Sequence, residues 1–347
     1  MKPLVSIIIP AFNAEKWIRY AVQSATAQTW PRKEIIVVDD GSKDQTAKVA
    51  KQLASKIVRV VSIPNQGAAA ARNHGLRLCQ GDYIQWLDAD DLLQPDKIAT
   101  QLSALGSDAG PGSKVLLSSP WAPFYYRTTG VRFVHNSLCQ NLPPVEWLLR
   151  KVGANLHMQT ATWLTSRALA EAAGPWDTRL LSDDDGEYFC RVLLASKGTR
   201  FVSGTGIFYR ITGSSRLSSI GNSNQKKDAM VISIKLHIAY LRSLEESARV
   251  RKACLVYLQN WFHNFYPERA DLVHQLQALA ADLGGQLQPP RLRWKYAWMQ
   301  PLFGWRTAKW AQDALPQWKG SCLRCYDRAL CRLQMAAGHE GRIWSVE

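Results

Sequence analysis

Three aspartates occur within four positions of the chain, at Asp88, Asp90 and Asp91. Carboxylate oxygens are the ligands that Mg²⁺ and Mn²⁺ prefer. A cation between them and a diphosphate would neutralise the charge that develops on a leaving group. Without such a cation the three carboxylates repel one another. The alternative explanation is a solvated acidic turn or a helix N-cap, so the cluster is a candidate metal and diphosphate site that depends on its context.

The residues around this cluster alternate between two periodicities. Continuous apolar runs predict buried strands at residues 4–9, 34–38, 57–63 and 83–87, and helical spacing predicts helices between them. This order predicts a mostly parallel sheet with right-handed crossovers. Ligands of such sheets bind beyond the carboxyl ends of the strands. We therefore expect three polar clusters to meet at one edge, although ordinary loops are polar too; the clusters are residues 10–13, 39–42 and 88–91.

Four motifs in this region resemble those of the family 2 glycosyltransferases. They are VSIIIPAFN (5–13), EIIVVDDGS (34–42), NQG (65–67) with ARN (71–73), and YIQWLDADD (83–91). The resemblance covers residues 3 to about 215 and then fades. It implies an α/β fold of the GT-A type, with a central, mostly parallel sheet. It also implies an inverting transfer from a nucleoside diphosphate sugar, expected to be a UDP-sugar.

The resemblance assigns roles on the donor side. It places Asp40 at the base of the nucleotide and Arg72 near the diphosphate, where a fixed guanidinium charge is suitable. A late motif at Tyr209-Arg210 and 214–216 adds Arg216. Turn-capping aspartates and a surface arginine are the alternatives. The expected donor-binding residues are Pro10, Ala11, Asn13, Glu15, Asp40, Arg72, Asp88 and Arg216, and the expected ligands of Mg²⁺ or Mn²⁺ are Asp90 and Asp91.

A second acidic segment at residues 183–191 resembles the acceptor side of the same family. Inverting transfer needs a general base that deprotonates the acceptor hydroxyl. Counting back from Arg191 assigns this role to Asp185, with Asp184 as its acidic neighbour. Asp184 and Gly186 depart from the residues usual in the family, which leaves the register open by one residue. The alternative is a helix N-terminus that favours acidic side chains.

The composition changes after about residue 215. We expect a GT-A catalytic domain at residues 1–215, with a donor and metal half (1–110) and an acceptor half (111–215), followed by a helical region at 216–347. From residue 291 onward, ten Lys and Arg stand against four Asp and Glu, and six of the fourteen tryptophans lie there. Such a segment is typical of an amphipathic cap or of an interface with an anionic membrane. Nucleic acid is the least favoured partner.

Charge and cysteine content indicate the type of partner and the cellular compartment. The formal net charge of +15 favours anionic partners. Seven scattered cysteines, an odd number, indicate reduced thiols. The first apolar run ends at Pro10, too early for a signal peptide, and no run approaches the ~18 apolar residues of a membrane span. The expectation is a cytoplasmic protein, with peripheral attachment to the inner face of the membrane as one arrangement.

Together these patterns predict a metal-dependent glycosyltransferase with a nucleotide-sugar donor and a hydroxyl-bearing sugar or lipid-linked acceptor. Polysaccharide, lipopolysaccharide or glycolipid synthesis is the expected setting. A nucleotidyltransferase is one alternative, but it would need a phosphate-binding loop after the first strand, and residues 10–15 contain no glycine. A non-catalytic nucleotide-sugar-binding protein is the other. The acids at Asp40, Asp90 and Asp185 argue against it.

Overall fold

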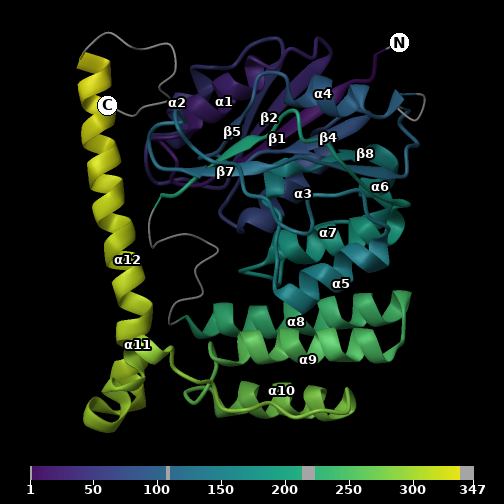
Figure 1. The fold of residues 1–347 in the computed structure, drawn as a ribbon. Coiled ribbons are helices and arrows are strands. Elements are labelled where there is room, and N and C mark those ends of the chain that lie inside the picture. The colour runs from purple at the N-terminus through teal and green to yellow at the C-terminus, as the bar shows by residue number, and fades with distance from the viewer. Residues whose placement is uncertain (1, 107–109, 213–222, 337–347) are drawn as a thin grey trace.

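A seven-stranded sheet forms the centre of the protein (Figure 1). A computed structural model of the chain describes residues 2–106, 110–212 and 223–336. The strand order is β3-β2-β1-β4-β8-β6-β9, and β8 alone of these strands runs antiparallel to its neighbours β4 and β6. The strands are β1 (Val5–Ala11), β2 (Lys33–Asp39), β3 (Val58–Ser62), β4 (Tyr83–Trp86), β6 (Val115–Ser118), β8 (Leu164–Ser166) and β9 (Gly198–Phe201).

The first half of this sheet confirms the predicted alternation of strands and helices. Helices α1 (Ile18–Thr26), α2 (Thr46–Lys51) and α3 (Ala68–Leu78) connect the four parallel strands. Every residue of β1 is buried, as expected of a central strand covered on both faces. Because β1 lies between β2 and β4, the loops that follow these three strands meet at one edge. The mostly parallel sheet that the sequence predicts is confirmed.

A smaller sheet contains β5 (Leu92–Leu93), β10 (Ile207–Arg210) and β7 (Trp121–Phe124). After β9 the chain turns at Ser203 and Gly204 and leaves the large sheet. After the turn, β10 pairs antiparallel with β5, directly beyond the acidic cluster. This turn therefore brings the end of β10 back to Asp88–Asp91.

The helices that follow residue 223 pack on the helices of the preceding part of the chain. Helices α8 (Asn224–Leu244) and α9 (Ala248–Phe262) contact α5 (Pro144–Ala154), and α8 also contacts α7 (Asp184–Ala195). Leu148, Leu193, Ile234 and Leu258 belong to one buried cluster that includes the sheet. The predicted boundary near residue 215 lies outside the described residues and stays a prediction.

Helices α4 (Lys97–Ser103) and α6 (Arg167–Ala173) flank the sheet. In the described part of the C-terminal region, three further helices follow α9. Helix α10 (Ala270–Asp282) packs on α8 and α9, and α11 (Trp294–Ala297) leads into α12 (Met299–Ala336), which runs along one side of the molecule (Figure 1). Gly304 has a φ of 76° and breaks α12. Within the described residues, no helix combines the length and apolarity needed to span a membrane.

Two helical glycines allow a test of the packing between α3 and β1. A Cβ at Gly75 would collide with the Cγ2 atom of Ile8, whereas a Cβ at Gly153 in α5 would meet Ala253 at an ordinary 3.6 Å. Alanine in a helix gains about 0.5–1 kcal/mol over glycine. Overpacking a core costs about 1–3 kcal/mol. We expect Gly75→Ala to lower the unfolding free energy and Gly153→Ala to raise it.

Urea unfolding of the two variants and the parent chain measures this difference. Equal effects of the two substitutions would contradict the close packing of α3 on β1.

Candidate active site

The acidic cluster divides into one buried and two partly exposed carboxylates. Asp88 and Asp90 are half-buried, and Asp91 is fully buried. Asp91 accepts hydrogen bonds from the Arg210 backbone N–H (2.8 Å) and from Gln159 Nε2 (2.7 Å). Burial, together with the nearby Asp90 and Asp88, raises the pKa of Asp91 well above its usual value. The geometry makes Asp91 an internal support of the loop and leaves Asp88 and Asp90 as the accessible carboxylates.

Arg210 at the end of β10 holds this loop from the other side. Its Nε donates to the backbone oxygen of Asp90 at 2.8 Å. The guanidinium lies over the rings of Trp17 (4.2 Å) and Phe124 (4.3 Å). Burial lowers the pKa of Arg210 to about 10, although Asp90 and Asp91 oppose this change. The late motif at residues 209–216 predicts a donor-binding role for Arg216, which lies outside the described residues, and predicts no role for Arg210.

Gln159 and Thr160 connect the acidic cluster to the predicted base. Gln159 Nε2 also approaches Asp88 Oδ2 at 3.4 Å, while its Oε1 accepts the Ala161 backbone N–H and so fixes the amide orientation. The neighbouring Thr160 Oγ1 donates to Asp185 Oδ2 at 2.8 Å. The two sequence-predicted acidic segments therefore converge on one short segment. The sequence does not predict a role for Gln159 or Thr160, because the residues that they contact are distant in the chain.

Arg72 forms a second connection between the two acidic segments. Its guanidinium donates to Asp88 (2.8 Å) and to Asp184 (2.6 Å), and it lies 4.4 Å from the ring centre of Trp176. Burial alone would lower the pKa of Arg72, but Asp184 and Asp88 raise it above its usual value. Burial raises the pKa of Asp184 to about 6, against the effect of Arg72. Asp184 is thus committed to an ion pair in this structure, and Asp185 is not.

The start of α7 explains the unusual glycine in the second acidic segment. Asp183 adopts a left-handed conformation (φ 58°) before the helix, and its Oδ2 accepts the Ser233 hydroxyl of α8 at 2.5 Å. A Cβ at Gly186 would collide with the Asp183 carboxylate. A residue without a Cβ at position 186 therefore leaves room for the Asp183 side chain at the start of α7. The role of Asp185 as the base stays a prediction.

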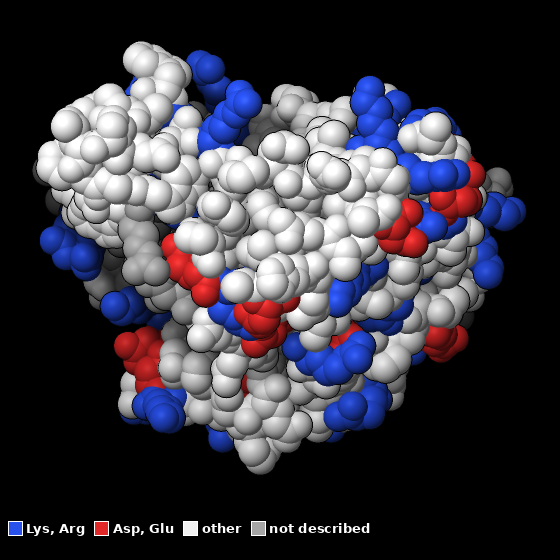
Figure 2. Space-filling model, turned by 90° about the horizontal axis from the view of Figure 1, so that it is seen from below, with Lys and Arg blue, Asp and Glu red and all other residues white. Residues whose placement is uncertain are grey.

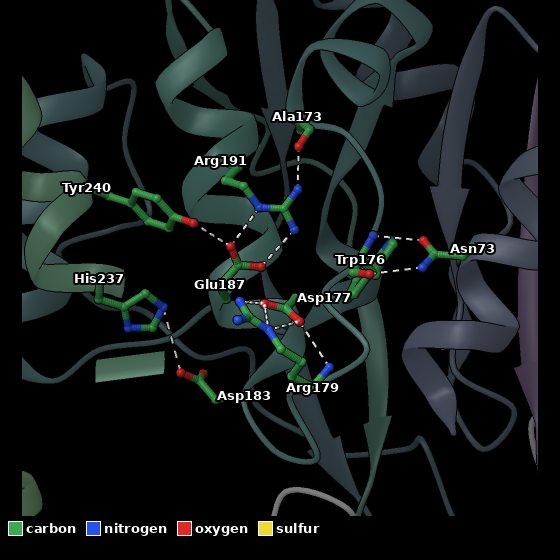
Figure 3. A network of polar contacts seen from close by, with 10 residues as sticks. All are labelled: Asn73, Ala173, Trp176, Asp177, Arg179, Asp183, Glu187, Arg191, His237 and Tyr240. Atoms are coloured by element: carbon green, nitrogen blue, oxygen red, sulfur yellow. Dashed lines mark hydrogen bonds and ion pairs between the residues drawn. The ribbon is translucent and has the colours of Figure 1, made fainter. Parts of the chain in front are cut away.

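Figure 3 shows the polar network that holds α7 and the turn before it. The buried Glu187 pairs with Arg191 through two bonds of 2.6 and 2.7 Å and accepts the Tyr240 hydroxyl at 2.7 Å. On the other side, Asn73 of α3 exchanges two hydrogen bonds with the backbone of Trp176. Asn73, predicted within a donor-side motif, thus supports the acceptor-side turn.

Comparison with known proteins agrees with the predicted resemblance. The sequence profile described as Glycosyl transferase family 2 matches residues 6–110. These residues, which make up less than a third of the chain, are therefore similar to glycosyltransferase family 2. An uncharacterized glycosyltransferase of Rickettsia typhi is 46% identical over 103 residues, which are 30% of this chain and 32% of that protein. Chondroitin synthase of Escherichia coli is 42% identical over 108 residues, which are 30% of this chain and 16% of that enzyme.

Solved structures extend the likeness beyond the matched residues. TarS 1–349 of S. aureus, crystallised with UDP-GlcNAc, superposes with a TM-score of 0.65 at 18% identity over 81% of each chain. A mannosyltransferase of Pyrobaculum calidifontis in complex with GDP-Man and Mn²⁺ gives 0.51 at 16% identity over 94% of this chain and 85% of that one. The predicted GT-A fold is confirmed.

Hydrogen bonds connect the predicted donor loops to one another. Both oxygens of the buried Asp40 accept backbone N–H groups, from Gln66 and Gly67, at 2.8 Å each. Burial raises the pKa of Asp40, and these N–H groups oppose the rise. Asn13 Oδ1 accepts the Lys43 N–H at 2.9 Å.

The remaining donor-side candidates lie beside these loops. Pro10 and Ala11 are buried at the end of β1, and Glu15 Oε2 accepts the Gln45 N–H at 3.0 Å. Every predicted donor residue that the structure describes is thus close to the edge of β1, β2 and β4. Their contacts with a nucleotide stay predictions.

The residues present fit a divalent cation that a diphosphate helps to hold. In the described part of the chain, no group of three or more His, Cys, Asp and Glu side chains could hold a metal without other ligands. Mg²⁺ usually takes one or two carboxylates and completes its coordination with phosphate oxygens and water. Asp88 and Asp90 provide two such carboxylates.

A charge change at Gln159 tests the connection to Asp91. Gln159→Glu would replace a donor by a carboxylate beside the buried Asp91, so we expect a loss of about 3 kcal/mol of unfolding free energy at neutral pH. The two carboxyl groups can share a proton in acid. The folded variant then binds more protons than the unfolded chain, and its deficit should shrink from about pH 7.5 to about pH 5.5.

Gln101→Glu is the matched control. Gln101 is also buried, but its Oε1 accepts from Lys97 Nζ at 2.7 Å. Burial lowers the pKa of Lys97 well below its usual value, and a carboxylate at position 101 would favour the charged form of this lysine and pair with it. Its deficit should grow on acidification. Urea unfolding across the pH range measures both variants, and a Gln159→Glu deficit that does not shrink in acid would count against the geometry.

Proposed function

We propose that the chain is an inverting glycosyltransferase that moves a sugar from a UDP-sugar to a hydroxyl-bearing sugar or lipid-linked acceptor. The observation that carries this proposal is the junction at Gln159–Thr160, which joins Asp88 of the acidic cluster to Asp185 at the start of α7. A donor activated at one acidic segment would thereby lie next to a base at the other. Such an arrangement is what a displacement at an anomeric carbon requires.

The comparisons support the reaction class and the setting. Relatives include chondroitin synthase and TuaG of Bacillus subtilis, a putative teichuronic acid biosynthesis glycosyltransferase, 42% identical over 29% of this chain and 41% of TuaG. The chain covers less than half the length of these relatives, so their whole activities are not transferred. The UDP-GlcNAc in TarS supports a uridine nucleotide. We propose a role in the synthesis of a cell-envelope polysaccharide, lipopolysaccharide or glycolipid.

Asp185 is suited to act as the general base. Thr160 Oγ1 and the Gly186 N–H donate to its two oxygens, which fixes the carboxylate without neutralising it. The acceptor hydroxyl would give its proton to Asp185 while its oxygen bonds to the anomeric carbon. The bond from that carbon to the diphosphate breaks, and the diphosphate leaves with the electron pair. Asp184, paired with Arg72, positions the base instead of sharing its role.

Asp88 and Asp90 are the residues that would hold a divalent cation. When bound, Mg²⁺ or Mn²⁺ would stabilise negative charge on the departing diphosphate. The Mn²⁺ in the mannosyltransferase structure supports this assignment. Both oxygens of Asp91 already accept hydrogen bonds from Gln159 and from the Arg210 backbone. We therefore place the metal contact at Asp90 and not at Asp91.

Replacement of the proposed base tests the mechanism. Asp185→Asn keeps an oxygen that can accept from Thr160 but cannot take a proton, so we expect kcat to fall by about 10²- to 10⁴-fold with little change in thermal stability. The measurement is UDP release from a panel of UDP-sugars with candidate acceptors. Asp228→Asn, which removes a surface carboxylate paired with Arg269, is the control and should retain activity. Undiminished transfer by Asp185→Asn would overturn the assignment.

Metal titration distinguishes Asp90 from Asp91. We expect a chelator to abolish transfer and added Mn²⁺ or Mg²⁺ to restore it. Asp90→Asn should raise the metal concentration for half-maximal rate by about tenfold or more, because a ligand is lost. Asp91→Asn should instead lower the unfolding temperature, because it disrupts two buried hydrogen bonds. The reverse pattern would move the metal contact to Asp91.

A further inference from the structure

The segment Trp294–Phe303, formed by α11 and the first residues of α12, exposes four large apolar side chains. Trp294 is 81% exposed, Trp298 59%, Leu302 69% and Phe303 57%. Single exposed apolar residues are common, but a contiguous group of this size indicates a binding surface. No described element covers these side chains.

The exposure does not result from a loose attachment of the segment. Just beyond Gly304, Trp305 packs edge-on against Tyr266 at 6.2 Å, and Lys309 Nζ donates to the Tyr266 carbonyl at 3.0 Å and pairs with Glu268 at 3.3 Å. These contacts fix α12 to the segment between α9 and α10. The backbone break at Gly304 then directs the preceding turn away from the body.

Basic side chains surround this apolar surface. Residues 291–336 contain nine Lys and Arg against two Asp, and Asp327 is already paired with Arg127 at 2.7 Å. Arg291, Arg293 and Lys295 flank Trp294 directly. Figure 2, which views this end of the molecule, shows a broad area without charged atoms on the side of α11 and α12, with Lys and Arg at its margin.

We propose that the Trp294–Phe303 segment docks on the surface of an anionic lipid bilayer. Trp and Phe rings suit the boundary between head groups and acyl chains, and Lys and Arg are attracted to anionic lipids. Apolar contact and charge attraction then act together on one face. This inference does not rest on the proposed transferase activity, since it concerns a surface distant in sequence from the acidic cluster.

A second copy of the chain is the main rival occupant. Exposed Leu315, Trp318, Tyr326 and Leu333 fall along one side of α12, as in a helix that pairs with another. A symmetric pair, however, would bring the same excess of cations on each copy face to face. Nucleic acid would use the charges and aromatic rings but would leave aliphatic side chains such as Leu302 without a partner. The charge and the apolar character together favour lipid.

Vesicle binding by the full chain tests the proposal. The probe is a vesicle of phosphatidylcholine with an equal amount of phosphatidylglycerol, compared with phosphatidylcholine alone. We expect co-sedimentation with the anionic vesicles at low salt and weaker binding at high salt. Trp298→Ala/Phe303→Ala and Arg291→Glu/Arg293→Glu/Lys295→Glu should each weaken binding by about tenfold or more.

Two control variants match these changes elsewhere on the surface. Leu244→Ala/Val256→Ala removes exposed apolar groups, and Lys48→Glu/Lys51→Glu/Lys56→Glu makes the same change in net charge; both should bind vesicles as the parent does. Failure of the parent chain to bind anionic vesicles would overturn the proposal. So would a Trp298/Phe303-dependent dimer, or binding to RNA alone.

Discussion

The central constraint on this structure is the need to hold several carboxylates close together. Arg72 meets this need where the two acidic segments approach, with a buried guanidinium that contacts both Asp88 and Asp184. Removing one partner of such a buried pair leaves an uncompensated charge and typically costs about 3–5 kcal/mol. Because Arg72 comes from α3 and Asp184 from α7, this single side chain sets the distance between the predicted donor and acceptor halves.

Uncharged hydrogen-bond donors hold the carboxylates of Asp91 and Asp185, and this has an electrostatic consequence. Asp91 accepts from a side-chain amide and a backbone N–H, and Asp185 accepts from a hydroxyl and a backbone N–H. Such donors fix the positions of the oxygens without adding positive charge. A divalent cation would relieve the repulsion among the carboxylates of this region. Replacing these donors by cations would hold the same geometry and remove the attraction for metal.

The sequence was sufficient to predict the first four strands, their parallel pairing and the convergence of the loops at residues 10–13, 39–42 and 88–91. Those features depend on local periodicity and on the order of elements along the chain. It could not predict Gln159, because a lone glutamine acquires its role only from Asp91, 68 positions away. Nor could it show that β9 and β10 belong to different sheets. Only the short turn at Ser203 and Gly204 separates these two strands in the sequence.

Helix α8, which lies outside the family match, contacts the start of the helix that carries the proposed base. The family match ends at residue 110, yet α8 supplies Ser233 to Asp183 and Tyr240 to Glu187, at the start of the helix that carries Asp185. A chain that stopped near residue 215 would leave both carboxylates without these partners. The helical region thus supports the start of α7, which carries Asp185, the proposed base.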